Sequence, residues 1–338
     1  TIVGSAPLAV PTSSKRDLGA FPVRINADNR TEWPADIARS VEMYNGWYRR
    51  FAPAVYRRER TGASAAVIAA MAATNDFAQI DATTLLATPG LLPALRMATC
   101  PPVARDRLTG LSGATDGIVS ALDFGVARPG GGGPDARRQL GLVASVLNDL
   151  LDVALFPWLS AGRPPTETER QNAASIVADR LCGANADPII RNAQEERQLQ
   201  EIERVLVLLG YRRATHPADR PLEDMPSGTY AFRMVVMVGP LHKTRLPVDV
   251  VIQPLTPRPD RLPVLIEAKS AGDFTNTNKR RKEEAQKHAQ LRERFGAQVS
   301  YVLFLCGYFG EGYLAYEADS GMDFVWEHRS DDLLQLGL

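Results

Sequence analysis

The residues with the clearest chemical potential are two acids and a lysine in neighbouring apolar segments. Asp249 lies within a predicted strand, 246–252, and Glu267 and Lys269 end the next predicted strand, 264–269. Because side chains alternate along a strand, Glu267 and Lys269 lie on the same face. If the two strands are neighbours, both carboxylates can bind Mg²⁺, which prefers oxygen ligands. The sequence therefore predicts metal-assisted hydrolysis of a phosphodiester, with Lys269 orienting the water and stabilising developing charge.

The lysine content of the chain singles out this region. The chain has 33 arginines but only six lysines, and five of the six fall between residues 243 and 287. An acid-x-Lys triplet occurs readily by chance, so the alternative interpretation is a surface ion pair at a strand end, with Asp249 as an edge charge. The apolar run before Glu267 and the presence of a second acid favour the catalytic interpretation.

A predicted helix over 278–295 begins with an unusual run of four cations. Acids are normally favoured at this positive end of the helix dipole, so the arrangement suits a helix that meets an anion such as a nucleic-acid backbone. The alternative is a solvated charged helix with ordinary i,i+4 pairs. The predicted DNA contacts are Arg245, Asn276, Asn278, Lys279, Arg280, Arg281 and Lys282.

A further acid, Glu195, belongs to a predicted helix over 189–209. At 100° per residue it continues an apolar stripe toward the start of that helix. We therefore predict Glu195 as an accessory metal ligand, although an exposed first-turn glutamate favoured by the helix dipole is the alternative. The apolar stripe consists of Leu199, Ile202, Leu206 and Leu209.

The elements around these residues divide the chain into three predicted parts. Residues 1–30 form a loosely ordered arm, and 31–182 form a helical region that contains a Gly-rich loop at 128–135. The first helix of that region starts at Trp33 and ends at Pro53. Separate helices follow, and then the period changes to that of strands. These helices cover 139–156, 166–181 and 189–209, and residues 183–338 form an α/β domain with a mixed sheet.

The composition narrows the function classes without choosing among them. The chain has 338 residues, and its 39 basic and 39 acidic residues balance, so contact with a polyanion requires a local patch. Its apolar runs are too short for a membrane span. The three cysteines show neither disulfide nor zinc spacing, which favours a reducing cytoplasm.

Beyond the short motif, long strings of the sequence resemble one nuclease family. Pro247-Val248-Asp249 and Glu267-Ala268-Lys269 match the PD-(D/E)xK nuclease superfamily. The string from Ile266 to Ala285 is similar to type II restriction endonucleases of the XamI type. Further similarity to that family occurs in the segments 97–108, 187–195 and 304–309.

This resemblance implies a Mg²⁺-dependent enzyme that cuts both strands of a palindromic DNA duplex, leaves a 5′-phosphate and recognises GTCGAC. It implies Asp249 and Glu267 as metal ligands and Lys269 at the attacking water. It also implies a homodimer and a cognate DNA methyltransferase that acts in the same system without physical contact. The alternatives are a repair or recombination nuclease that selects DNA by shape, and a non-catalytic DNA-binding module.

Overall fold

The computed structural model describes residues 24–127, 129–217, 220–239, 244–257, 261–275 and 277–338. The chain forms two compact units. One unit joins the residues up to Tyr44 to Glu195–Leu338, and the other comprises Asn45–Gln194. The division at residue 182 stays a prediction, because compactness does not show which segments fold independently.

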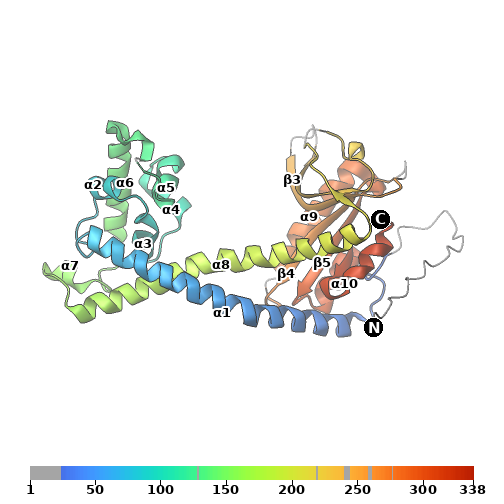
Figure 1. Cartoon of the computed structure of the whole chain (residues 1–338), viewed down its shortest axis with the longest axis horizontal. Coiled ribbons are helices and arrows are strands. Elements are labelled where there is room, and N and C mark those ends of the chain that lie inside the picture. The colour runs from blue at the N-terminus through green and yellow to red at the C-terminus, as the bar shows by residue number, and fades with distance from the viewer. Residues whose placement is uncertain (1–23, 128, 218–219, 240–243, 258–260, 276) are drawn as a thin grey trace, which may run out of the picture. The chain divides into compact units, whose positions relative to one another are not determined.

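The first part of the chain is helical and the strands come after it, as the sequence predicted (Figure 1). The helices are α1 (Trp33–Ala73), α2 (Ala82–Ala87), α3 (Leu92–Met97), α4 (Arg105–Ser112), α5 (Asp116–Asp123), α6 (Pro134–Leu150), α7 (Pro157–Ala161), α8 (Glu167–Leu208), α9 (Thr277–Phe295) and α10 (Glu311–Asp319). The strands are β1 (Arg212–Arg213), β2 (Thr229–Val238), β3 (Thr244–Gln253), β4 (Val264–Ala271), β5 (Ser300–Gly307) and β6 (Asp323–Trp326).

The strands form one six-stranded mixed sheet in the order in which they occur along the chain. β2, β3 and β4 pair in antiparallel fashion, whereas β4, β5 and β6 are parallel, and β1 runs parallel to β2. The parallel half requires a crossover between β4 and β5, and α9 supplies it. This architecture confirms the predicted α/β fold with an N-terminal helical region.

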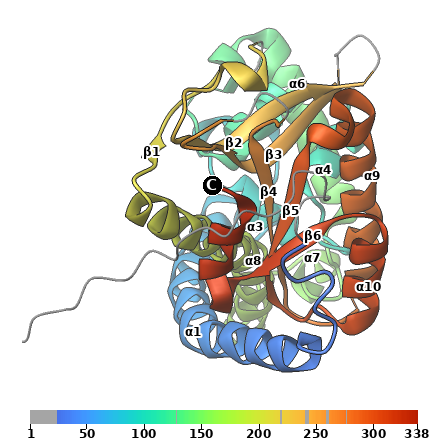
Figure 2. The same cartoon turned by 90° about the vertical axis from the view of Figure 1, so that its right-hand side faces the viewer.

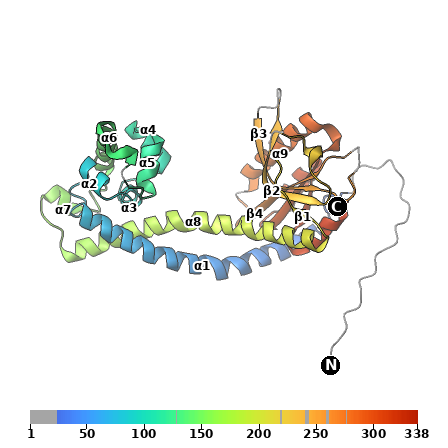
Figure 3. The same ribbon diagram turned by 45° about the horizontal axis from the view of Figure 1, so that its top comes forward.

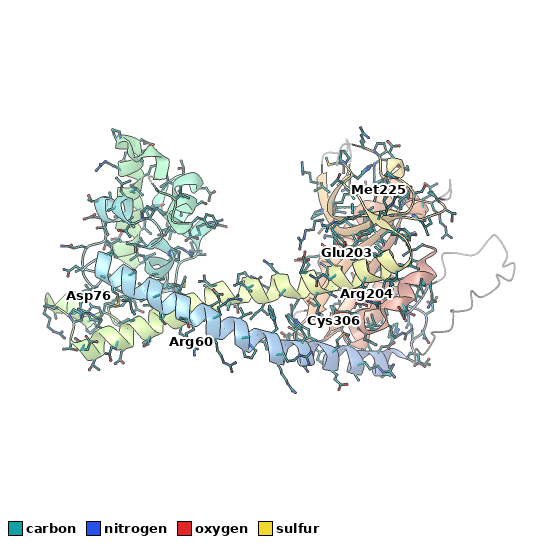
Figure 4. All side chains as sticks on the ribbon, in the orientation of Figure 1. Arg60, Asp76, Glu203, Arg204, Met225 and Cys306 are labelled. Carbon is teal, nitrogen blue, oxygen red and sulfur yellow. The ribbon has the colours of Figure 1, made fainter. Side chains whose placement is uncertain are left out.

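Helices cover both faces of this sheet. α9 and α10 lie along one face (Figure 2), where Leu291 and Leu314 join Leu265 and Leu305 of the sheet in one core. On the other face, the last turns of α8 pack Ile202 and neighbouring residues against the sheet. Figure 4 labels Glu203 and Arg204 on this part of α8. A strand buried on both faces explains why β4 and β5 read as nearly continuous apolar runs.

The segment just before α1 is packed, although it belongs to the predicted loosely ordered arm. Ile25, Asn26 and Ala27 are buried. The backbone N–H groups of all three donate to the carboxylate of Asp323 at the start of β6. The Asn26 side chain also donates to the Phe324 backbone oxygen at 2.9 Å.

In the helical unit, α1 continues through Pro53, so the prediction that this helix ends there is wrong. A proline inside a helix removes one backbone hydrogen bond and crowds the preceding turn. Here the neighbouring Ala52 and Val55 are buried with Ala186 and Ile190 of α8, and this packing offsets the loss. The two long helices run side by side in this region (Figure 3).

The two predicted helices over 166–181 and 189–209 are likewise one helix. α8 runs unbroken from Glu167 to Leu208 and contains Pro188. Its residues Ala186 and Ile190, on either side of this proline, are both buried. Burial of its flanks again keeps the chain helical where local propensity predicts a break.

The Gly-rich segment forms a short turn rather than a long link. A 3₁₀ turn covers Pro129–Gly132, and Gly130 and Gly131 have φ angles of 58° and 76°. Such left-handed angles favour glycine, which explains the residue type there. α6 starts immediately afterwards at Pro134, in the first-turn position that proline favours.

One glycine beside β4 has no room for a side chain. Gly307 has a φ of 100°, and a Cβ atom there would lie 2.1 Å from the backbone oxygen of Ala271. We expect Gly307→Ala to lower the free energy of unfolding by about 2–4 kcal/mol, because backbone must move. Denaturant unfolding measures this. Gly312→Ala, where nothing lies within 4 Å of the added atom, is the control and should be neutral or slightly stabilising; equal effects of both variants would contradict the prediction.

Candidate active site

Asp249 and Glu267 come from neighbouring antiparallel strands. Val250 pairs with Ile266 on β3 and β4, so the next step along the register places Asp249 opposite Glu267. Residues opposite each other in an antiparallel pair carry their side chains on the same face. The Asp249 carboxylate also accepts a hydrogen bond of 2.8 Å from the backbone N–H of Ala268. The strand pairing therefore brings the two predicted carboxylates together.

The Glu267 carboxylate is shared by two lysines. Its Oε1 atom lies 3.0 Å from Nζ of Lys269 and 2.5 Å from Nζ of Lys287. Its side chain is only 4% exposed, and its buried Oε2 atom has no hydrogen-bond partner among the residues that the structure describes. A buried carboxylate oxygen that lacks a partner is costly unless a ligand supplies one.

Helix α9 adds two residues that sequence reasoning missed. Glu284 places its Oε1 atom 3.1 Å from Nζ of Lys269. Lys287 contacts Glu267 and also donates to the backbone oxygen of Pro247 at 3.3 Å. Both residues lie on the side of α9 that faces the sheet, where Glu284 is 1% exposed. Their polar type on a charged helix gave no signal that they would face the sheet.

The electrostatics of the site follow from burial and from charge alternation. Burial and the neighbouring Glu267 raise the pKa of Asp249 to about 6. Burial alone would lower the pKa of Lys269, but the carboxylates of Glu267 and Glu284 outweigh it and raise this pKa. At neutral pH, Lys269 is therefore an ammonium held between two carboxylates.

The carboxylates of Asp249 and Glu267 repel each other and are suited to binding a divalent cation between them. Burial, followed by repulsion from Glu267, raises the pKa of Asp249, and a cation between the two carboxylates would relieve that repulsion. The unpartnered Oε2 of Glu267 offers a ligand atom. Among the residues described, no group of three or more acids, histidines or cysteines could hold a metal. A site built on two carboxylates, with water and phosphate oxygens completing the shell, is typical of Mg²⁺.

Glu195 lies near the site but has an arginine partner. Its Oε1 atom accepts from Nε of Arg233 at 3.0 Å, and both side chains are well exposed. Its negative charge contributes to the raised pKa of Asp249. Arg233 adopts a φ of 50° inside β2, an uncommon conformation for a residue with a side chain. The role of Glu195 as a metal ligand stays a prediction.

The predicted DNA contacts have mixed surroundings. Arg245 and Lys282 are exposed on β3 and α9. Arg281 instead turns toward α10, where its guanidinium lies 4.5 Å from the ring centre of Tyr316. This cation–π contact and the buried Nε of Arg281 make it a poor candidate for DNA. Outside the described residues lie Asn276 and the side chains of Asn278, Lys279 and Arg280.

Comparison with known proteins decides what kind of enzyme carries this site. The model of the XamI restriction endonuclease family matches residues 75–326. The chain belongs to this family. It is also 49% identical over 313 residues to the protein named type II restriction enzyme SalI from Streptomyces albus G, a match that covers 93% of this chain and 99% of that protein. No solved structure matches significantly.

The membership confirms the resemblance predicted from the sequence. This XamI-family protein is a type II restriction endonuclease, an enzyme that hydrolyses DNA site-specifically. Restriction enzymes of this type generally use a divalent metal ion. The non-catalytic alternative is therefore wrong. In the described part of the chain, no helix has the length and apolar character to cross a bilayer.

Metal binding by this XamI-family enzyme is expected to weaken in acid. Because the pKa of Asp249 is about 6, a proton competes with the cation below that pH. Each pH unit below 6 should reduce the apparent metal affinity about tenfold, until other carboxylates titrate. Calorimetric titration of the DNA-free enzyme with metal at pH 5 and pH 7.5 measures this. A constant affinity between these two values would contradict the assignment of Asp249.

Proposed function

We propose that this restriction endonuclease uses Mg²⁺ to hydrolyse one phosphodiester in each strand of the palindrome GTCGAC. Asp249 and Glu267 hold the ion, and Lys269 acts at the attacking water. The observation that carries this proposal is the cluster of two carboxylates and one ammonium on β3 and β4, with a buried oxygen of Glu267 left without a partner. The target sequence rests on the family resemblance.

The side chains divide the work of hydrolysis. A bound divalent cation polarises the phosphate and makes a coordinated water more acidic. Asp249 and Glu267 lie next to the paired residues Val250 and Ile266, so the sheet helps to preorganise both carboxylates. The ammonium of Lys269 can orient the water by hydrogen bonding and offset the negative charge that develops on the phosphate. Attack of water on phosphorus would form the new P–O bond and break the bond to the 3′ oxygen, which leaves as a hydroxyl, so the phosphate stays on the 5′ oxygen of the other fragment.

Further residues complete the proposal at the DNA. Glu195 serves as an accessory carboxylate if Arg233 leaves it and pairs with a phosphate of the DNA instead. Arg245 and Lys282 are exposed cations that suit contacts to the DNA backbone. Asn276, Asn278, Lys279 and Arg280 stay predicted contacts at the start of α9.

The target implies the assembly and the biological setting. A palindrome cut on both strands is most simply matched by a twofold homodimer, in which each copy cuts one strand. A methyltransferase that modifies the same target would protect the host DNA, and both enzymes would act in the cytoplasm. The homodimer can be tested by measuring the size of the enzyme in solution with target DNA.

The decisive experiment compares two plasmids that differ in one base pair. One plasmid carries a single GTCGAC and the other carries the same site with one of its central base pairs changed. With MgCl₂ we expect only the first plasmid to be linearised, and sequencing of the ends should give identical cut positions and 5′-phosphates. EDTA should abolish the reaction.

The possible outcomes separate the proposal from its competitor. Discrete fragments that map to a different sequence would overturn the target while keeping the restriction activity. Cutting at branched or mismatched DNA, without sequence preference, would favour the repair or recombination nuclease. Cleavage with EDTA present would overturn the metal dependence.

A further inference from the structure

The two lysines beside Glu267 differ in what else holds them. Lys269 has a second carboxylate within reach, because Oε1 of Glu284 lies 3.1 Å from its Nζ atom. The other lysine, Lys287, has the backbone oxygen of Pro247 as its additional contact, at 3.3 Å. A full negative charge attracts an ammonium more strongly than a carbonyl dipole does.

Occupation of the site would change the balance at Glu267. A divalent cation competes with both ammonium groups for the Glu267 carboxylate and repels them. Of its contacts with the described residues, Lys287 would then retain the one with the backbone oxygen of Pro247. Lys269 would retain the Glu284 carboxylate, which is 1% exposed and therefore little screened by water.

The fold fixes Glu284 in this position. It lies on α9 in line with His288 and Leu291, and all three residues are buried toward the sheet. The hydroxyl of Tyr313 on α10 lies 3.5 Å from its Oε2 atom. A second buried acid, Glu317, lies close enough that burial and the charge of Glu284 raise its pKa to about 8. Near neutral pH, Glu317 is therefore largely protonated.

We propose that Glu284 is a positioning residue that keeps Lys269 at the attacking water when Glu267 is engaged by the metal. The inference rests on the proposed function, because it requires Lys269 to act at the scissile phosphate. Glu284 itself touches neither the substrate nor the metal. Its loss should therefore impair the chemical step and leave DNA binding intact.

The first test separates catalysis from binding. Glu284→Gln should reduce the single-turnover rate at saturating Mg²⁺ about 10- to 100-fold, the range expected when a catalytic group is misplaced. The dissociation constant for target DNA in Ca²⁺ should change less than about twofold, because no contact to DNA is removed. Glu283→Gln, an exposed neighbour on α9, is the matched control and should cleave normally. A normal rate for Glu284→Gln would overturn the inference.

A double-mutant cycle shows whether Glu284 acts through Lys269. In a Lys269→Met background, adding Glu284→Gln should cause no further loss of the residual rate. The melting temperature of the metal-free protein gives a readout without activity. Glu284→Gln should lower it more in the wild type than in the Lys269→Met background, where the ion pair with Lys269 is already lost. Independent losses of rate, or equal shifts of the melting temperature in both backgrounds, would indicate a purely structural role.

The proposed function can fail separately from this inference. If Lys269→Met cleaves as fast as the wild type, the catalytic assignment itself fails. If Lys269→Met is inactive while Glu284→Gln cleaves normally, only the positioning role is overturned.

Discussion

Asp249→Asn is expected to reduce cleavage of target DNA by a factor of ~10³ or more at saturating Mg²⁺. The amide keeps an oxygen that can accept from the Ala268 N–H but removes the negative charge that would hold the cation. Single-turnover digestion of a labelled duplex measures the effect. Asp319→Asn is a suitable control, because Asp319 pairs with Arg30 in an exposed contact and should not influence the rate.

The same variant should be more stable than the wild type when metal is absent. Folding raises the pKa of Asp249 from its usual 3.8 to about 6, so the folded state disfavours the charged form. The ionisation of Asp249 therefore lowers the stability of the metal-free protein progressively as the pH rises from about 4 to 6. Asp249→Asn removes that cost and should gain about 1–3 kcal/mol at pH 7 in EDTA. Lower stability of the variant would contradict the proposed electrostatics.

Lys269→Met is expected to reduce the single-turnover rate by a factor of roughly 10²–10⁴, the usual loss when a group that aids proton transfer or charge stabilisation is removed. Methionine preserves the length of the side chain but removes the ammonium. Binding of target DNA in Ca²⁺ should persist, because the ammonium lies among carboxylates in the site.

A matched measurement distinguishes lost chemistry from lost structure in this variant. Its denaturant unfolding should stay cooperative, with a reduced midpoint since Glu267 and Glu284 lose a shared partner. A folded Lys269→Met protein that cuts at the wild-type rate would show that another group acts at the water.

Local patterning predicted the strands well. The bounds predicted for β3 and β4 differ from those of the structure by two residues at most at each end. These strands are marked by β-branched and aromatic residues and are bounded by turn residues, so the information is local. Local patterning did not predict α10 and β6 near the end of the chain. Both elements are short and are stabilised by packing against the rest of the unit.

The grouping of Asp249, Glu267 and Lys269 was predictable because the three residues lie in apolar strands, where acids and lysines are rare. Glu284 and Lys287 were not, because their helix is polar over most of its length and only the tertiary fold shows which side faces the sheet. The helix boundaries at Pro53 and Pro188 failed for a related reason. Proline predicts a break locally, but burial of neighbouring residues in the core decides the outcome.

The short segment at Ile25–Ala27 protects the sheet from unwanted association. β6 is the last strand in the order, so its outer side presents backbone groups that another chain could pair with. The Asn26 side-chain amide donates a hydrogen bond to the backbone oxygen of Phe324, and the carboxylate of Asp323 accepts one from the backbone N–H of Ala27. Truncated versions of the enzyme that begin after Ala27 would expose this edge of β6. We expect them to be less soluble, because β6 strands of separate copies could then pair with one another.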